Sequence, residues 1–333
     1  MSWSSQEVRL AQRPQGRPDA STWQLATTEV PEPGPGEFVV RIDLISLDPA
    51  MRGWLNDVRS YVPPVGIGEV MRAFAAGEVI ASEHADFAVG DAVSGTFGVR
   101  EHVLSDGKGV TKLDLDVAPM ATWLGALGMP GMTAYFGLED VGRAQPGETV
   151  LVSAAAGAVG SVVAQLAKAK GCRVIGVAGG PDKVAWLRDL GLDEVIDRKE
   201  GDLLRQVRRA APDGVDVYFD NVGGELLDAA LANLARGARI AICGAISTYN
   251  DETLAEGPRR YMALLVFRAS MQGFLVMDYL DRYPEGIAAI SKLIEQDRLV
   301  ATETVLEGGV AGFPDALLGL FDGVNTGKLL LKV

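Results

Sequence analysis

Cysteine and histidine are scarce in this chain of 333 residues, which has only two of each. Two isolated cysteines, Cys172 and Cys243, cannot supply the clustered ligands of a structural zinc site. Both lie in apolar stretches, which predicts two buried, reduced thiols and no disulfide. The histidines, His84 and His102, form no constellation with serine, cysteine or aspartate, and we interpret them as surface or structural residues. We therefore expect neither a metal site nor a histidine-based nucleophile.

A net positive charge and long apolar runs are also lacking. The chain has 31 Lys and Arg against 44 Asp and Glu, a net charge of −13. This sign is opposite to that of polyanion-binding proteins, so we expect neither nucleic acid nor a membrane surface as a partner. The longest apolar stretches, such as residues 262–267, are far shorter than the ~18 residues of a membrane span. Residues 1–14 are polar and do not look like a signal peptide, so we expect a soluble cytoplasmic protein.

The length of the chain exceeds the ~100–200 residues of one ordinary domain, so two domains are expected. The first third has short strand patterns at residues 38–45, 77–80 and 92–97, separated by Gly, Pro and Asp. This spacing suggests a small β-barrel or sandwich. Strand patterns return at residues 302–306 and 329–333, which we expect to fold back onto the N-terminal domain.

The pattern changes from residue 122 onward, where helical patterns at residues 121–127 and 132–138 lead into a regular alternation. Strand patterns follow at residues 149–153, 173–177, 194–196, 215–219 and 238–243. Helical patterns separate them at residues 159–170, 182–190, 202–210 and 225–235. A helical stretch after residue 260 and a strand pattern at residues 272–276 offer a sixth strand. Strands that alternate with helices predict an α/β domain with a doubly wound parallel sheet.

A turn of small residues, SAAAGAVG at residues 153–160, links the first of these strands to its helix. It fits a dinucleotide fingerprint in which Ala155 stands in place of the usual first glycine. Gly157 would let the backbone approach a pyrophosphate, and Gly160 would let the helix pack close to the strand. The predicted helix begins at Val159, directly after Ala158, and the free N–H groups and partial positive charge at this end favour phosphates. The alternative is a small-residue turn that binds no nucleotide, but the strand–helix setting favours a dinucleotide site.

The end of the second strand distinguishes between the two nicotinamide cofactors. An NAD site usually has Asp or Glu there, ~20 residues downstream, to hold the ribose hydroxyls. This chain has VAGG at residues 177–180, in which Gly179 leaves room for an additional phosphate. Lys183 follows within one helical turn, and Arg198 after the third strand is a second cation. The negative charge of Asp182 disfavours a phosphate here, and Lys183 alone would be interpreted as a solvated helix residue. The absence of an acidic residue at the end of the second strand nevertheless favours NADP.

The cofactor must carry the chemistry, because no catalytic constellation of side chains is evident. Tyr249 follows the fifth strand, in CGAISTYN at residues 243–250. Ligands bind at this carboxyl end of the strands in open parallel sheets. The tyrosine hydroxyl can donate a hydrogen bond to a developing enolate oxygen. The alternative is an aromatic lid that packs on the cofactor.

Collinear motifs along nearly the whole chain match one known family. They are SLDPAMRG at residues 46–53, YVPP at 61–64, GEVMR at 68–72, GMTAYFG at 131–137, the turn at 153–160, FDNVGGE at 219–225, ISTYN at 246–250, MQGF at 271–274 and NTGK at 325–328. With these motifs the chain resembles the zinc-independent medium-chain dehydrogenase/reductases. Within them it is most similar to the branch of leukotriene B4 12-hydroxydehydrogenase/prostaglandin reductases, alkenal double-bond reductases and curcumin reductase.

The resemblance implies a fold, an activity and an assembly. The fold is a GroES-like β-rich catalytic domain at residues 1–125, completed by residues 300–333, with a Rossmann NADP-binding domain at residues 126–299. The activity is NADPH-dependent reduction of the carbon–carbon double bond of α,β-unsaturated ketones or aldehydes, and the protein would be a homodimer. The zinc-dependent relatives carry Gly-His-Glu where this chain has Ile67-Gly68-Glu69, which agrees with the expected absence of metal.

The resemblance also carries residues over. It places Lys183 at the 2′-phosphate, Tyr249 near the nicotinamide ribose and substrate, and Thr133, Asn221 and Asn325 along the cofactor. The residues assigned to cofactor binding are Thr133, Ala155, Gly157, Ala158, Val159, Gly160, Gly179, Lys183, Arg198, Asn221, Cys243, Ile246, Tyr249, Phe274 and Asn325. Tyr249 is the candidate catalytic residue, and the substrate pocket is assigned to Ala50, Tyr61 and Tyr279.

Two positions depart from the family pattern. Ala50 stands where the family often has tyrosine, which is expected to widen or reshape the substrate pocket. Arg198 stands where a tyrosine near the 2′-phosphate is common, and its positive charge should not harm a preference for NADP. Other functions stay open at this point: a secondary-alcohol dehydrogenase, a quinone reductase, or a non-catalytic NADPH-binding sensor.

Overall fold

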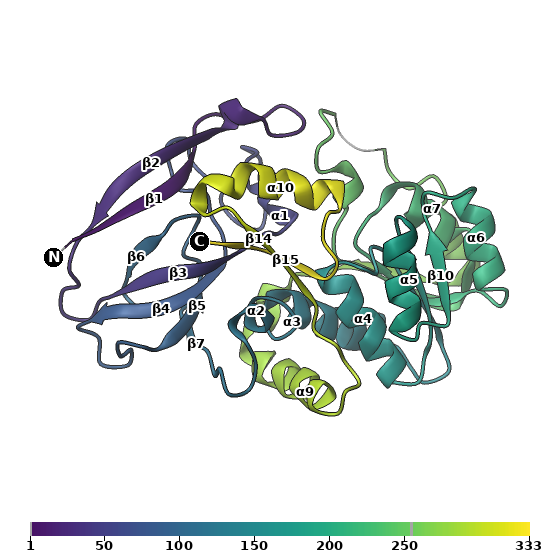
Figure 1. Cartoon of the computed structure of the whole chain (residues 1–333). Coiled ribbons are helices and arrows are strands. Elements are labelled where there is room, and N and C mark those ends of the chain that lie inside the picture. The colour runs from purple at the N-terminus through teal and green to yellow at the C-terminus, as the bar shows by residue number, and fades with distance from the viewer. Residues whose placement is uncertain (1, 254–255) are drawn as a thin grey trace. The chain divides into compact units, whose positions relative to one another are not determined.

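The computed structural model describes residues 2–253 and 256–333, which form two compact units. Unit 1 contains the chain up to Leu124, together with Asn250–Glu252 and Glu303–Val333. Unit 2 contains Gly125–Tyr249 and the segment from Thr253 to Thr302. Figure 1 labels the helices and strands of both units.

Unit 1 is rich in strands and has few helices. Its strands are β1 Trp3–Leu10, β2 Trp23–Val30, β3 Phe38–Ser46, β4 Ala75–Ser82, β5 Ala92–Gly95, β6 His102–Ser105, β7 Thr111–Lys112, β14 Glu303–Glu307 and β15 Lys328–Lys332. Its helices are α1 Ala50–Trp54, α2 Met120–Leu124 and α10 Phe313–Asp322, with short 3-10 turns at Ala20–Thr22 and Val310–Gly312.

Strand β3 is the centre of unit 1 because both of its faces are apolar. Phe38, Val39 and Val40 have no exposed surface. The main sheet has the order β14-β15-β3-β4-β5-β7, and β6 also pairs with β3. β15 runs antiparallel to β3, so the yellow C-terminal strand lies beside a purple N-terminal strand in Figure 1. β1 and β2 form a separate antiparallel hairpin.

Unit 2 alternates strands and helices. Its strands are β8 Thr149–Val152, β9 Arg173–Ala178, β10 Glu194–Asp197, β11 Val215–Asp220, β12 Leu234–Ile242 and β13 Ser270–Gly273. Its helices are α3 Met129–Phe136, α4 Ala158–Ala169, α5 Pro181–Asp189, α6 Leu203–Ala210, α7 Gly224–Leu231, α8 Ala263–Phe267 and α9 Tyr283–Glu295. A π-helical turn at Gly137–Gly142 and 3-10 turns at Ile246–Thr248 and Val276–Arg282 complete it.

The strands of unit 2 form one parallel sheet in the order β10-β9-β8-β11-β12-β13. The order reverses direction after β8, which makes the sheet doubly wound and confirms the predicted fold class. Both faces are covered, as the buried run of Val150, Leu151 and Val152 in β8 shows. All six strands therefore end at the same edge of the sheet, where the candidate site lies.

Two predicted boundaries in unit 2 are wrong. The helix predicted for residues 225–235 ends at Leu231, and β12 already begins at Leu234. The reason is tertiary: the Asn233 amide donates to Ala211 O at 2.8 Å, and Leu234 pairs with Val215 of β11. The sixth strand is Ser270–Gly273, not residues 272–276, because its register is set by pairing with Arg239 to Ile242 of β12.

The structure also places the scarce residues. Both cysteines are free; Cys172 is buried, as predicted, but Cys243 is only half-buried, which corrects the expectation for that thiol. His84 is structural, since its ring packs edge-on against Phe38 and Phe87. In the residues that the structure describes, no helix is both long and apolar enough to span a membrane.

Candidate active site

The turn of small residues at 153–160 connects β8 to helix α4. Ala155 N donates to Val177 O of the neighbouring strand at 2.9 Å, so the turn is held at the edge of the sheet. The backbone is extended at Gly157, which caps the helix, and α4 begins at Ala158. The N–H groups of the first helical turn have no acceptor within the helix, so this end of α4 can bind an anion.

Gly160 is required by a close approach of the backbone. A Cβ at this position would lie 2.3 Å from Ala154 O and 2.9 Å from Ala155 Cα. Ala154 itself has a φ of 47°, an unusual left-handed conformation for alanine that closes the turn. A side chain at Gly160 would therefore push helix α4 away from the turn and open the anion-binding end of the helix.

A group of three cations surrounds the backbone at the end of β9. An ideal Cβ on Gly179 would lie 3.0 Å from Arg198 Nε and 3.4 Å from Lys199 Cε. Lys183, on α5, is half-buried; burial lowers the pKa of its amine, and the nearby charges of Arg198 and Lys199 lower it further. Within residues 2–253 and 256–333, none of these three cations forms an ion pair. We call Lys183, Arg198 and Lys199 the cation group.

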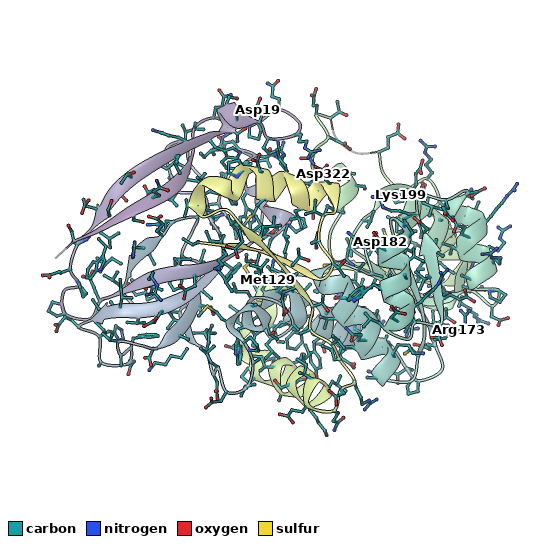
Figure 2. The ribbon with its side chains drawn as sticks, viewed as in Figure 1. Asp19, Met129, Arg173, Asp182, Lys199 and Asp322 are labelled. Carbon is teal, nitrogen blue, oxygen red and sulfur yellow. The ribbon has the colours of Figure 1, made fainter. Side chains whose placement is uncertain are left out.

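Lys199 did not emerge from the sequence, although it directly follows Arg198. Figure 2 labels Lys199 and, on helix α5, Asp182. One carboxylate is held nearby: Asp197 Oδ1 accepts hydrogen bonds from Gly180 N at 3.0 Å and Lys199 N at 2.9 Å. These bonds and the adjacent cations keep the pKa of Asp197 low, so it stays ionised. Because the Asp197 carboxylate is already engaged by these backbone N–H groups, the cation group remains available for a phosphate on an adenine ribose.

The loops that follow β11 and β12 are bonded to each other and to the turn at 153–160. Asn221 donates to Ser153 O through its side chain at 2.8 Å and to Ser153 Oγ through its backbone at 2.7 Å. Ile246 N donates to Asn221 O at 3.2 Å, and Cys243 N donates to Asp220 O at 2.8 Å. The structure thus brings the predicted residues Asn221, Cys243 and Ile246 to the edge where the turn lies.

Tyr249 follows the 3-10 turn at Ile246–Thr248 and is half-buried. Its hydroxyl oxygen accepts a hydrogen bond from Ala245 N at 3.3 Å. The same oxygen lies 2.9 Å from where a Cβ would stand on Gly244. The ring is therefore folded back over its own loop, at the carboxyl end of β12.

The other predicted residues of unit 2 have aromatic or buried surroundings. Thr133 is buried and donates from Oγ1 to Met129 O at 2.8 Å. Phe274 packs edge-on against Phe219, with ring centroids 6.1 Å apart. Tyr279 stacks on Phe136 at 4.6 Å, and the Arg282 guanidinium lies over the Phe136 ring.

The remaining predicted residues belong to unit 1. Asn325 is buried and donates from its side chain to Gly327 O at 2.6 Å. Ala50 is the first residue of α1 and is half-buried. Tyr61 is exposed, and its hydroxyl accepts a hydrogen bond from Trp54 Nε1 at 3.4 Å.

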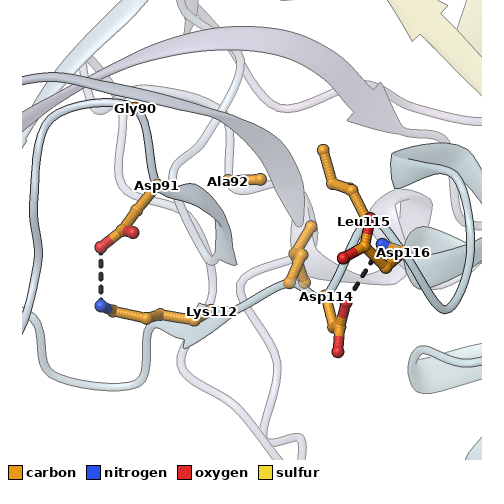
Figure 3. Close-up of a pocket in the computed structure, with 8 residues that line it drawn as sticks. Gly90, Asp91, Ala92, Lys112, Asp114, Leu115 and Asp116 are labelled. Carbon is orange, nitrogen blue, oxygen red and sulfur yellow. Dashed lines mark hydrogen bonds and ion pairs between the residues drawn. The ribbon is translucent and has the colours of Figure 1, made fainter.

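A pocket in unit 1 lies apart from all of these residues. Residues 90–92 and 112–116 line it (Figure 3). Asp91 and Lys112 form an ion pair across it at 2.7 Å, and Asp116 N donates to Asp114 Oδ1 at 3.0 Å. It contains no residue of the candidate site, and we assign it no ligand. In the described part of the chain, no group of three or more His, Cys, Asp or Glu could hold a metal ion.

The parallel sheet, the glycine-bearing turn and the cation group define a protein of the Rossmann type. Two family models match the chain: one described as the N-terminal domain of oxidoreductase, over residues 6–113, and one described as zinc-binding dehydrogenase, over residues 158–292. The NADPH-dependent curcumin reductase of Escherichia coli is 40% identical over 97% of this chain and 95% of its own. An NADP(+)-dependent 2-alkenal reductase of Nicotiana tabacum is 39% identical over 99% of this chain and 98% of its own.

A solved structure gives the same result. The crystal structure of CurA from Vibrio vulnificus in complex with NADPH is 42% identical, covers 98% of this chain and 99% of its own, and has a TM-score of 0.93. The chain therefore belongs to the medium-chain dehydrogenase/reductase family, in the branch that holds the curcumin, alkenal and prostaglandin reductases. This confirms the resemblance seen in the sequence.

Proposed function

We propose that this protein is an NADPH-dependent oxidoreductase that reduces the carbon–carbon double bond of α,β-unsaturated ketones and aldehydes. The observation that carries the proposal lies at the carboxyl edge of the sheet in unit 2. There, hydrogen bonds through Asn221 connect the loop of Tyr249 to the turn at 153–160. The named activities of the relatives, curcumin and 2-alkenal reduction with NADP(H), support the same reaction.

The chain's own residues fit NADPH. The pyrophosphate would bind at the N-terminus of α4, beside Gly157 and Gly160, and the 2′-phosphate would bind the cation group. Asn221, Cys243, Ile246 and Tyr249 would line the nicotinamide end, with Thr133, Phe274 and, from unit 1, Asn325. When bound, NADPH supplies the hydride that the β-carbon of the substrate receives.

Tyr249 acts on the substrate oxygen in this proposal. Reduction at the β-carbon leaves negative charge on the carbonyl oxygen, as an enolate. The Tyr249 O–H is the proposed donor to this oxygen, and a donor held in place stabilises charge that appears only during the reaction. The α-carbon then takes a proton, which we assign to water. Ala50, Tyr61 and Tyr279 are proposed to shape the substrate pocket.

The two units would have different roles, one catalytic and one cofactor-binding. We propose that residues 1–125, completed by residues 300–333, form the GroES-like catalytic domain, and that residues 126–299 form the NADP-binding domain. The separate family matches to residues 6–113 and 158–292 support this division.

A side-by-side assay tests the reaction. Oxidation of NADPH is followed at fixed enzyme with a trans-enone, an enal, a bulky dienone, a quinone and a secondary-alcohol couple. Consumption of the alkenes, with the saturated carbonyl as product, is the expected result. Turnover of the quinone or the alcohol couple alone would favour those alternatives. Tight NADPH binding without turnover of any electrophilic alkene would favour a non-catalytic sensor.

We further propose that the protein is a cytoplasmic homodimer. The exposed edge of unit 2 supports the dimer, because β13 is the outermost strand of the parallel sheet and carries the exposed Met271. On α8, Leu265 is 71% exposed and Val266 is 59% exposed. An unpaired edge strand next to exposed apolar side chains is a typical interaction surface.

A further inference from the structure

The buried carboxylate of Asp220 is the strongest feature of unit 2 that the proposed reaction does not use. The side chain stands at the end of β11, and only 1% of the residue is exposed. Its Oδ1 accepts hydrogen bonds from Tyr218 Oη at 2.7 Å, Gly223 N at 2.9 Å and Val222 N at 3.0 Å. Ser153 Oγ of the cofactor turn is a more distant donor, at 3.3 Å. Burying a carboxylate is costly, so this cluster of donors indicates a specific task.

The donors to Asp220 lie on two different segments. Val222 and Gly223 form the turn that follows β11, and Ser153 directly follows strand β8. Tyr218 is fully buried in β11 and holds the carboxylate from below the edge of the sheet. The carboxylate therefore fixes the turn at residues 221–223 against the rigid end of the sheet.

The turn at residues 221–223 is hydrogen-bonded to the loop of Tyr249. Val222 O accepts hydrogen bonds from Ser247 Oγ at 2.6 Å and Ser247 N at 3.2 Å. Asn221 O accepts from Ile246 N at 3.2 Å. The turn also leaves little room for movement, since a Cβ on Gly223 would lie 3.3 Å from Ala245 Cβ. A continuous set of hydrogen bonds thus runs from Tyr218 through Asp220 and Val222 to Ser247, two residues before Tyr249.

We propose that Asp220 and Ser247 are positioning residues for the reduction, which act by holding the loop at residues 245–249 so that the Tyr249 hydroxyl meets the substrate oxygen. This inference rests on the proposed function of Tyr249. Neither residue needs to touch the substrate, because each acts through the backbone of Val222. A hydroxyl that is displaced by a fraction of an ångström loses much of its effect on the transition state.

Ser247→Ala is the first test, because it removes one hydrogen bond from an exposed side chain and leaves the backbone bond to Val222 in place. We expect kcat with an enone to fall about fivefold, while the Kd for NADPH, measured by fluorescence, stays unchanged. Ser291→Ala is the matched control: Ser291 Oγ is buried in unit 2 without a hydrogen-bond partner in the described residues, and its loss should leave kcat unchanged.

Two variants of Asp220 separate shape from charge. Asp220→Asn keeps an oxygen acceptor for Val222 and Gly223, so its kcat should fall less than that of Asp220→Ala, which removes the acceptor. Equal losses in the two variants would mean that the charge of Asp220, not its hydrogen bonds to the turn, is what matters, and would overturn the proposed role.

The dependence on Tyr249 gives the decisive comparison. If Ser247 acts through Tyr249, adding Ser247→Ala to Tyr249→Phe should lower kcat no further, whereas independent effects would multiply. Full multiplication would overturn the inference and leave the proposed function intact. If Tyr249→Phe alone has no effect on kcat, the proposed role of Tyr249 fails, and with it this inference.

Hydrogen–deuterium exchange gives a readout that does not depend on activity. The amides of residues 245–249 should exchange faster in Ser247→Ala and in Asp220→Ala than in the wild type, with the amides of α9 unchanged as the internal reference. Unchanged exchange at residues 245–249 in both variants would overturn the inference, even if no enone proved to be a substrate.

Discussion

The hydroxyl oxygen of Tyr249 lies 2.9 Å from the point where a Cβ would stand on Gly244. Real Cβ atoms do not come this close to another heavy atom, so any side chain at Gly244 must displace the tyrosine ring. The glycine after β12 is thus tied to the position of the proposed catalytic group. No property of the sequence pattern alone assigns this role to Gly244.

Gly244→Ala is expected to lower kcat for an enone by about tenfold, because the methyl group moves the Tyr249 hydroxyl off its position. The Kd for NADPH should change little. Steady-state kinetics and a fluorescence titration measure the two quantities. Gly273→Ala is the matched control, since a Cβ there, at the end of neighbouring strand β13, would meet nothing within 4 Å. A Gly244→Ala enzyme with wild-type kcat would show that the ring position is unimportant.

Tyr249→Phe is expected to lower kcat by about tenfold or more, because it removes the donor to the enolate oxygen and leaves the ring in place. The rate is measured with a good enone at saturating NADPH. Tyr261→Phe, at an exposed tyrosine of the same unit, should leave the rate unchanged. Wild-type turnover in Tyr249→Phe would remove this residue from the mechanism and favour an aromatic lid over the cofactor.

Lys183→Ala and Lys199→Ala are each expected to weaken NADPH binding severalfold, and to leave NADH binding nearly unchanged, because only NADPH carries the 2′-phosphate. Lys183 should have the larger effect, since it is half-buried and Lys199 is exposed. Dissociation constants for both cofactors in low and moderate salt check this, with the exposed Lys292→Ala on α9 as the control. Equal losses for NADPH and NADH would argue against a phosphate contact.

Leu265→Asp is expected to convert the proposed dimer into monomers, because it places a charge within the exposed apolar surface of α8 beside β13. Light scattering coupled to gel filtration gives the mass of each variant. Val89→Asp, at an exposed turn of unit 1, should keep the wild-type mass. If the wild type already runs as a monomer at micromolar concentration, the dimer proposal is wrong.

Glu303→Gln is expected to stabilise the protein more at pH 8 than at pH 5. Burial raises the pKa of Glu303, and a hydrogen bond from Thr122 Oγ1 at 3.0 Å only partly opposes this shift. Because the pKa of Glu303 is higher in the folded than in the unfolded state, its protonated form adds to the free energy of unfolding at low pH. This contribution is lost as the pH rises through the folded-state pKa. Glutamine stays neutral and keeps an acceptor for Thr122, so its Tm advantage should grow with pH. Glu307→Gln, exposed at the other end of β14, is the control, and a constant Tm difference for Glu303→Gln would contradict the prediction.

The sequence predicted the alternating half of the fold well because buried parallel strands and their helices leave a strong pattern. It failed where packing decides. Asn233 ends α7 through a bond to Ala211, 22 positions away, which no local pattern reveals. Helices α9 and α10 were not predicted, although Pro284 and Pro314 in their first turns are typical helix starts. β1 and β2 were missed because polar residues make up half or more of each, and in β1 even Ser5 and Glu7 are buried, so the apolar alternation of a strand is broken.

For the site, the sequence supplied the residue types and the structure supplied their connections. Lys183 and Arg198 were predicted from the missing acid after β9, and Lys199 had a signal in its position beside Arg198. Asp220 and Ser247 had none, because a carboxylate at a strand end and a serine in a loop are both ordinary. Only the positions of their hydrogen-bond partners distinguish them.

The pairing of β15 with β3 sets an order on how the molecule is made. The strands of unit 2, β8 to β13, follow one another along the chain, so this unit is synthesised as one nearly continuous segment. The sheet of unit 1 cannot close at β3 until residues 328–332 have been synthesised. β3 ends at Ser46 and β15 begins at Lys328, so β3 must wait through about 280 further residues, ~14–56 s at ordinary rates of translation. During that interval the apolar edge of β3 lacks its C-terminal partner, which makes the nascent N-terminal segment, rather than the nucleotide-binding unit, the expected client of chaperones.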